Sequence, residues 1–107
     1  MRTKGGFKNQ GSRISPYPTP LSDAIRAVLE RIAPGAELAN SHCVGFTDSN
    51  WFRAAYPDTV AYNFAPHVVE SYEEVTPRYH NVDERIHVRD LACQALFAEH
   101  VALELLR

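Results

Sequence analysis

The sequence predicts a small α/β domain built around a partial parallel sheet. Three observations indicate this class: a capped amphipathic helix over residues 20–33, two β-forming segments at 36–39 and 59–64 that flank a second helix over 48–55, and a helical pattern over 89–106. Two strands separated by a helix normally join through a right-handed parallel crossover. We therefore expect a partial parallel-sheet α/β/α layer that the helices cover.

Composition favours one soluble domain. The chain has 107 residues, of which 45% are hydrophobic and 22% charged, as expected for a single core. No apolar run reaches the roughly 18 residues of a membrane span, and the start lacks the apolar segment of a signal peptide. Cys43 and Cys93 are isolated, which argues against a disulfide framework or a zinc ribbon. We expect reduced cysteines, no membrane contact and a cytoplasmic protein.

Charge is distributed unevenly along the chain. Residues 1–13 carry four cations and no acid. Because the whole chain has a net charge of −2, the remaining residues carry a net charge of −6. Four cations without interleaved aromatic residues are a weak footprint for nucleic acid, so no nucleic-acid partner is expected. Residues 1–15 are interpreted as a basic tail or connection, and residues 16–107 as the domain.

The first helix has clear start and stop signals. Thr19 is a suitable N-cap, Pro20 suits the first helical position, and Asp23 complements the positive end of the helix dipole. Pro34 and Gly35 end the helix. An apolar stripe at helical spacing predicts the face turned to the core: Leu21, Ile25, Val28, Leu29 and Ile32.

The remaining elements are assigned from propensity and spacing. Thr47 can cap the helix over 48–55, and residues 59–64 are rich in β-formers. Residues 67–79 lack periodicity and are interpreted as a long loop over the carboxyl end of that strand, where open α/β sheets bind ligands. Apolar positions then predict a long covering helix to the end of the chain: Leu91, Ala95, Ala98, Ala102, Leu105 and Leu106.

The stretch GFTDSN is the first candidate site. Gly45 permits a close backbone approach, and Thr47 offers a hydroxyl at a helix N-terminus, where amide N–H groups and the dipole favour an anion such as a substrate carboxylate. The alternative is that Thr47 only caps the helix and Asp48 only offsets the dipole. The local sequence alone does not decide between an anion site and a simple helix cap.

The stretch HNVDERI is the second candidate site. A neutral imidazole is a common zinc ligand, so His80 is a candidate, and Asp83 or Glu84 could fix its tautomer. The alternative is an ordinary loop histidine, because zinc needs at least three protein ligands. The other histidines form no recognised ligand spacing with it: His42, His67, His87 and His100.

Taken together, the run PGAEL, GFTDSNWFR, AYNFAP and HNVDERIHV resembles the carboxyl-terminal part of a two-zinc metallopeptidase family. This family includes aminoacylase, acetylornithine deacetylase, succinyl-diaminopimelate desuccinylase and glutamate carboxypeptidase. The resemblance covers most of residues 16–107. It rests most on the Thr47-Asp48 turn, the segment from Tyr62 to Pro66, and the spacing from His80 to Glu84.

The resemblance implies a zinc-dependent amide hydrolase with a zinc-exopeptidase-like fold. It implies that His80 is a metal ligand, that Thr47 and Asp48 form a substrate-side turn with Gly45, and that Glu84 and Arg85, with Asp83, hold the histidine loop. Two zinc ions would activate water for attack on an amide carbonyl. The family often has glycine and arginine where Phe46 and Asn50 stand here, which changes how a substrate carboxylate would be held.

The other parts of the family's site are missing from the sequence. The family's first metal histidine, bridging aspartate and Glu-Glu pair have no counterpart, and Glu73-Glu74 lacks the neighbouring motif and is interpreted as solvated. Three hypotheses remain open: an inactive fragment, the carboxyl-terminal subunit of a split enzyme, and a non-catalytic binding module. The expected partners are an N-terminal half of the catalytic domain, a peptide or N-acyl amino acid substrate in the full enzyme, or a second copy in a homo-oligomer.

Overall fold

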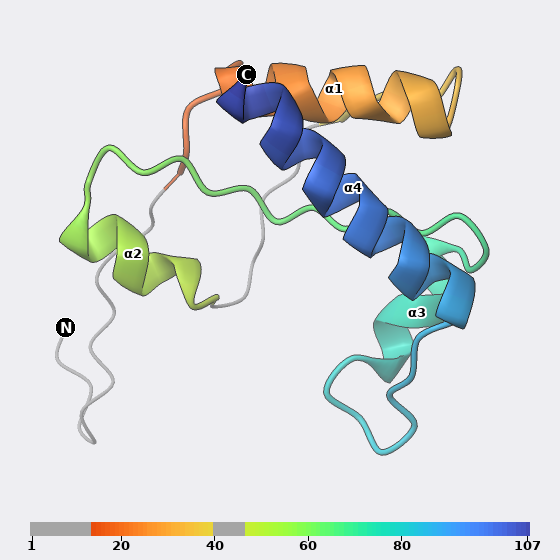
Figure 1. Ribbon diagram of the computed structural model, residues 1–107. Helices are drawn as coiled ribbons and strands as arrows, with labels where there is room; N and C mark the ends of the chain where they lie inside the picture. Colours follow the sequence, from red (N-terminus) through yellow and green to blue (C-terminus); the bar gives the residue numbers. More distant parts are fainter. Residues whose placement is uncertain (1–13, 40–46) are drawn as a thin grey trace, which may run out of the picture. The chain divides into compact units, whose positions relative to one another are not determined.

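The computed structural model describes residues 14–39 and 47–107, and every regular element in them is helical (Figure 1). In chain order these elements are α1 (Pro20–Ile32), α2 (Ser49–Ala55), α3 (Tyr72–Val75), the 3-10 helix η1 (Thr76–Arg78) and α4 (Val88–Leu106). Those residues contain no strand, so the predicted parallel-sheet α/β fold is wrong. The three predicted helices are confirmed, with ends within one residue of those expected.

The two segments predicted as strands, 36–39 and 59–64, have no regular structure. A β-former needs a neighbouring strand to pair with, and propensity does not supply one. In residues 59–64, the Ser15 side chain forms two hydrogen bonds with the backbone of Ala61, where a neighbouring strand would otherwise bond. The amide of Ala61 donates to Ser15 Oγ at 2.9 Å, and the Ser15 hydroxyl donates to the Ala61 carbonyl at 3.0 Å.

The chain divides into two units, which are described separately. The first contains residues 14–16 and 47–62 of the described chain and includes α2. The second contains residues 17–39 and 63–107 and includes α1, α3, η1 and α4. The core described below belongs to the second unit.

Helix α1 forms for the reasons that its sequence indicates. The amide of Ser22 donates to Thr19 Oγ1 at 3.4 Å, and Ser22 Oγ in return accepts from the Thr19 amide at 2.8 Å. These two bonds satisfy backbone donors that the first turn leaves without helical partners. The helix ends before Ala33, and Gly35 follows at φ 85°, a left-handed conformation that glycine adopts without strain.

The core of the second unit lies where α1 packs against α4, which cross in Figure 1. Val28 is fully buried, a contribution of roughly 1.5–3 kcal/mol for a side chain of this size. The Phe64 and Phe97 rings lie 5.0 Å apart between centroids and are tilted by 38°. The predicted face of α1 is largely confirmed. The buried apolar residues of this unit are Ala24, Ile25, Val28, Leu29, Val75, Phe97 and Val101.

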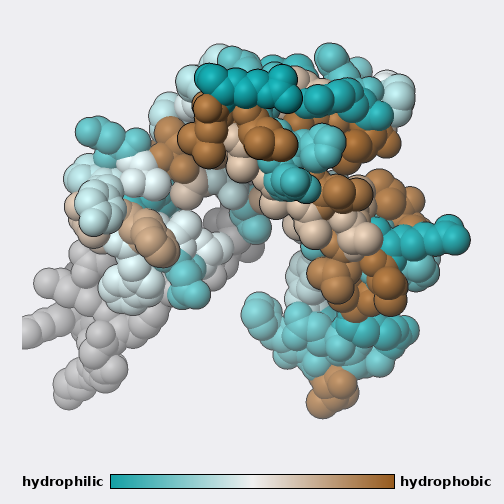
Figure 2. Space-filling view, viewed as in Figure 1, coloured by the Kyte–Doolittle hydropathy of each residue, from teal (hydrophilic) through white to brown (hydrophobic). Residues whose placement is uncertain are grey.

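Helix α4 turns a different face to this core from the one that its apolar pattern suggested. Its buried residues are Asp90, Phe97 and Val101. The predicted stripe, from Leu91 to Leu106, is exposed, and Figure 2 shows hydrophobic surface along this helix. No helix in residues 14–39 and 47–107 combines the length and apolar character that a membrane crossing requires.

Candidate functional site

His80 occupies a tight turn between η1 and α4. Its φ is 57°, and Tyr79 before it has φ −62° and ψ 130°. The Asn81 amide donates to the Arg78 carbonyl at 3.2 Å across these two residues. These angles match a type II turn with His80 at the third position, where glycine or asparagine is usual. His80 therefore holds a conformation that costs a side-chain-bearing residue free energy.

The His80 side chain is exposed at this turn. Within residues 14–39 and 47–107, its imidazole has no hydrogen-bond or ion-pair partner. A strained backbone position with an exposed, uncommitted imidazole is consistent with a ligand role. We call residues 79–86 the histidine loop.

Glu70 joins the two ends of the histidine loop. Its Oε2 accepts from Arg78 Nη2 at 2.7 Å, two residues before His80, and its Oε1 accepts from the backbone amide of His87 at 3.2 Å. The side chains of Arg78 and Glu70 are only 14% and 19% exposed. A single carboxylate thus closes the loop at its base with one ion pair and one backbone hydrogen bond.

Asp90 holds the segment that carries Glu70. This residue lies in the first turn of α4 and is fully buried. Its Oδ1 accepts from the amides of Val68 and Val69 at 2.7 and 2.9 Å, and its Oδ2 accepts from the Glu70 amide at 3.1 Å. Three successive amides converge on one carboxylate, which fixes residues 68–70 to the start of α4.

Both carboxylates are stabilised in their ionised forms. The hydrogen bond from Arg78 is the largest cause that holds the pKa of Glu70 below its usual 4.5. Burial by itself would raise the pKa of Asp90. The three amide hydrogen bonds and the neighbouring His67 ring outweigh burial, and they lower this pKa from 3.8 to about 2. The base of the loop is therefore charged throughout the neutral range.

Two other histidines have structural positions near this base. His87 is the N-cap of α4, and its Nδ1 accepts from the Arg89 amide at 3.1 Å. His67 lies with Nδ1 at 3.5 Å from Asp90 Oδ2, and Gln94 beside it donates from Nε2 to the Pro66 carbonyl at 3.1 Å. These contacts add polar support to the segment that Asp90 holds.

The tip of the loop is exposed and bonded mainly to itself. Asp83 and Arg85 form an ion pair, with side chains 67% and 60% exposed. The Glu84 amide donates to the Asn81 carbonyl at 3.1 Å, which adds a second turn. Their predicted support of a metal ligand stays a prediction.

The structure adds supporting residues that the sequence did not indicate. Glu70, Arg78 and Asp90 lie up to 20 residues apart, and no local spacing connects them. The one available signal was Asp90 in the first turn of a helix, which is ordinarily explained by the dipole.

The predicted substrate residues are only partly described. Gly45 lies outside the described residues. Asp48, rather than Thr47, takes the N-cap position of α2, and no side-chain hydrogen bond caps that helix, so the capping role predicted for Thr47 is wrong. The Thr47 hydroxyl instead bonds to the Ser49 hydroxyl. Both predicted residues belong to the first unit and His80 to the second, so a shared pocket stays a prediction.

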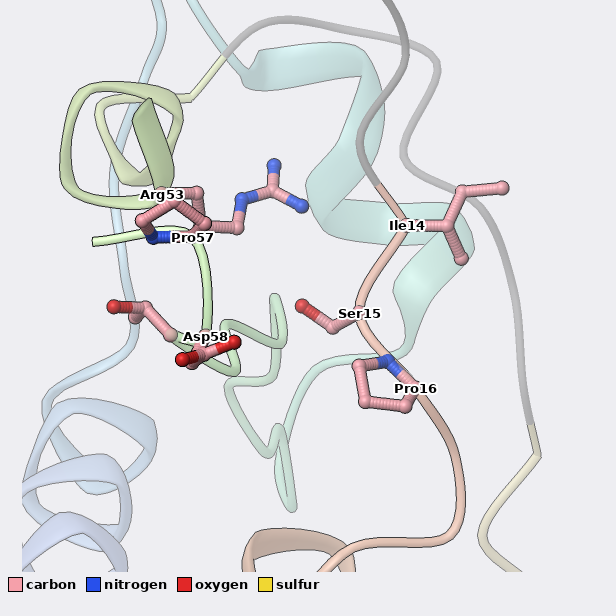
Figure 3. A pocket seen from close by; sticks show the side chains of 7 residues that line it. Ile14, Ser15, Pro16, Arg53, Pro57 and Asp58 are labelled. Carbon is pink, nitrogen blue, oxygen red and sulfur yellow. The ribbon is translucent and has the colours of Figure 1, made fainter. Parts of the chain in front are cut away.

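The first unit contains an open pocket of about 430 Å³ (Figure 3). Arg53 and Asp58 line one side and Ser15 the other, and the Arg53 side chain extends into the space between them. The described lining does not include Thr47 or Asp48. The lining includes one cation and one acid, so the pocket has no strong preference for a ligand of either charge.

The described residues do not hold a zinc site by themselves. Residues 14–39 and 47–107 contain no group of three or more His, Cys, Asp or Glu side chains arranged to hold a metal ion. A protein zinc site needs at least three such ligands. A ligand role for His80 therefore stays a prediction.

Comparison with models of protein families, with curated proteins and with solved structures finds no match for this chain.

Proposed function

We propose that this chain contributes a metal-ligand histidine, His80, and part of the substrate pocket to a zinc-dependent amide hydrolase, either an exopeptidase or an N-deacylase. The remaining ligands and the general base would come from polypeptide outside these 107 residues. The observation that carries the proposal is the exposed His80 ring at a strained turn whose base is closed by Glu70.

The order of the sequence motifs is the second support. The Thr47-Asp48 turn, the segment ending at Pro66, the histidine loop and a terminal helix follow one another as in the two-zinc metallopeptidase family. Residues 14–39 and 47–107 contain no sheet, so the fold does not support the proposal, which depends on these motifs and on the His80 turn. We propose the cytoplasm as its compartment.

Zinc in such a site lowers the pKa of bound water and polarises the amide carbonyl. This chain's task would be to present one neutral imidazole nitrogen at a fixed place. A preset turn lowers the entropy lost when the ligand is ordered, which favours binding.

The first test measures zinc binding by the isolated chain. Calorimetric titration with Zn²⁺ should show no tight site, because one imidazole without further ligands binds zinc weakly. The substitution His80→Ala should leave the fold intact, as judged by circular dichroism. Tight stoichiometric binding by the isolated chain would contradict the proposal.

The second test restores the rest of the site. The chain is co-expressed with an N-terminal half from a two-zinc amide hydrolase, and hydrolysis of a panel of N-acyl amino acids and dipeptides is measured with zinc present. His80→Ala should lower the rate by more than about 100-fold, since loss of a ligand should exceed the loss of a supporting residue. His100→Ala, at an exposed position on α4, is the matched control and should retain the rate.

Two results would count against this function. Full activity in the reconstituted His80→Ala variant would remove His80 from the site. No zinc-dependent hydrolysis with the unchanged chain, despite a stable complex, would favour the alternative of a non-catalytic binding module.

A further inference from the structure

We propose that Glu70 is a positioning residue that sets the conformation of the histidine loop by holding both of its ends. The inference concerns the loop itself, and its meaning for zinc rests on the proposed function. Glu70 lies ten residues before His80 and outside the family motifs quoted above.

The geometry separates Glu70 from an ordinary surface acid. One carboxylate oxygen accepts from the Arg78 guanidinium at 2.7 Å and the other from the His87 amide at 3.2 Å. Arg78 is also the first residue of the turn that contains His80, because its carbonyl accepts from Asn81. Glu70 is therefore bonded directly to a residue of the turn that contains His80.

The carboxylate can act as a fixed point because its own backbone is held. The Glu70 amide donates to the buried Asp90, together with the amides of Val68 and Val69. On the other side, the Ser71 hydroxyl accepts from the Glu74 amide at 3.2 Å and begins α3. Glu70 is thus bonded on both flanks before it reaches the loop.

Capping of α4 does not account for this arrangement. The N-terminal amides of a helix need acceptors, and the His87 side chain already supplies one to Arg89. A carboxylate that only capped α4 would not need the Arg78 side chain, which is slightly more buried than Glu70 itself. Contact with both ends of one loop is what a positioning role requires.

The test follows the order of the loop by nuclear magnetic resonance in the 107-residue chain without metal. Glu70→Gln keeps the size of the side chain but removes the charge that pairs with Arg78. Amide hydrogen exchange across residues 79–86 should rise by roughly tenfold, with lower order parameters for the His80 ring. Exchange within α1 should stay unchanged.

Two further variants separate positioning from general stability. Glu73→Gln changes an exposed acid in the first turn of α3 and should leave the loop unchanged. Arg78→Lys keeps the charge and should preserve most of the loop's order, whereas Arg78→Met should reproduce the effect of Glu70→Gln. If Glu70→Gln unfolds the chain, the Lys and Met variants at position 78 decide the question.

Each outcome is decisive. Faster exchange confined to the loop supports the inference. Unchanged loop exchange in Glu70→Gln, or equal acceleration in α1 and the loop in Arg78→Met, overturns it. Because no zinc and no substrate are present, these results are independent of the hydrolysis assay, so either proposal can fail while the other stands.

Discussion

The base and the tip of the histidine loop are held in opposite ways. At its base, Asp90 is fully buried and binds three amides, and Glu70 bonds to two separate segments. At its tip, the charged pair of Asp83 and Arg85 is mostly exposed and bonds within the loop. The base connects elements far apart in sequence, whereas the tip connects only near neighbours.

This difference shows which charges determine the structure. A charge that leaves water must find partners, and several fixed amides can replace its hydration. An exposed pair keeps its water and contributes little, typically 0–1 kcal/mol. Substitution of the buried Asp90 should therefore lower the stability of the fold, while substitutions at the exposed tip should change stability little.

The largest effect is expected for Asp90→Asn. Asparagine keeps one oxygen for the amides of Val68 and Val69, but it turns an NH₂ group toward the Glu70 amide, so two donors face each other. The melting temperature should fall by on the order of 10 °C in thermal denaturation. Asp90→Ala leaves three amides without an acceptor and should lower the melting temperature further.

Asp23→Asn is the matched control for this prediction. Asp23 also lies in the first turn of a helix, but its side chain is 68% exposed and pairs with the exposed Arg26 in the i,i+3 position. Both substitutions remove a favourable interaction with a helix dipole. An equal loss of stability in the two variants would show that the dipole, and not the buried amide contacts, explains the role of Asp90.

The next effect concerns acid. The folded-state pKa of Asp90 is about 2, below its usual 3.8, so its contribution to stability is full above about pH 4 and is lost as the pH falls toward 2. The pKa of Glu70 is also lowered, from 4.5, so its contribution to stability is likewise lost as the pH falls below 4.5. The charged or titratable groups that face them are His67, Arg78 and each other.

Urea unfolding between pH 6 and pH 2 measures this dependence. The wild-type chain should lose stability steadily below about pH 4.5, and Asp90→Asn should lose less over the same interval because its own acid contribution is absent. Identical slopes in the two proteins would assign acid sensitivity to other carboxylates.

The sequence predicted α1, α2 and α4 well because their signals are local, but the loop predicted over residues 67–79 contains α3 and η1. The cap at Thr19, the proline at position 20 and the apolar period all lie within a few residues of one another. The predicted sheet failed because pairing is not local: residues 59–64 have β propensity, but only a partner strand makes a ladder. The base of the histidine loop was missed for the same reason, since Glu70 and Asp90 are related only by folding.

Helix α4 shows a second limit of sequence patterns. Its apolar residues occupy more than one face, so periodicity predicts a helix but does not say which face meets the core. Phe97 and Val101 are buried, while Leu91, Leu96 and Leu103 are about half exposed. Helices that are apolar on several sides are usually covered on several sides, and a further partner for α4 stays a prediction.

The smallest effect tests the tip. At φ 57°, His80 is strained by its left-handed conformation, which glycine adopts without strain. His80→Gly should therefore raise the free energy of unfolding by about 1 kcal/mol relative to His80→Ala, measured by urea denaturation.

Asp83→Asn, at an exposed tip residue, is the control and should change the free energy of unfolding by less than about 1 kcal/mol. If glycine and alanine at position 80 give equal stability, the turn is unstrained, and the support that its geometry lends to a ligand role is removed.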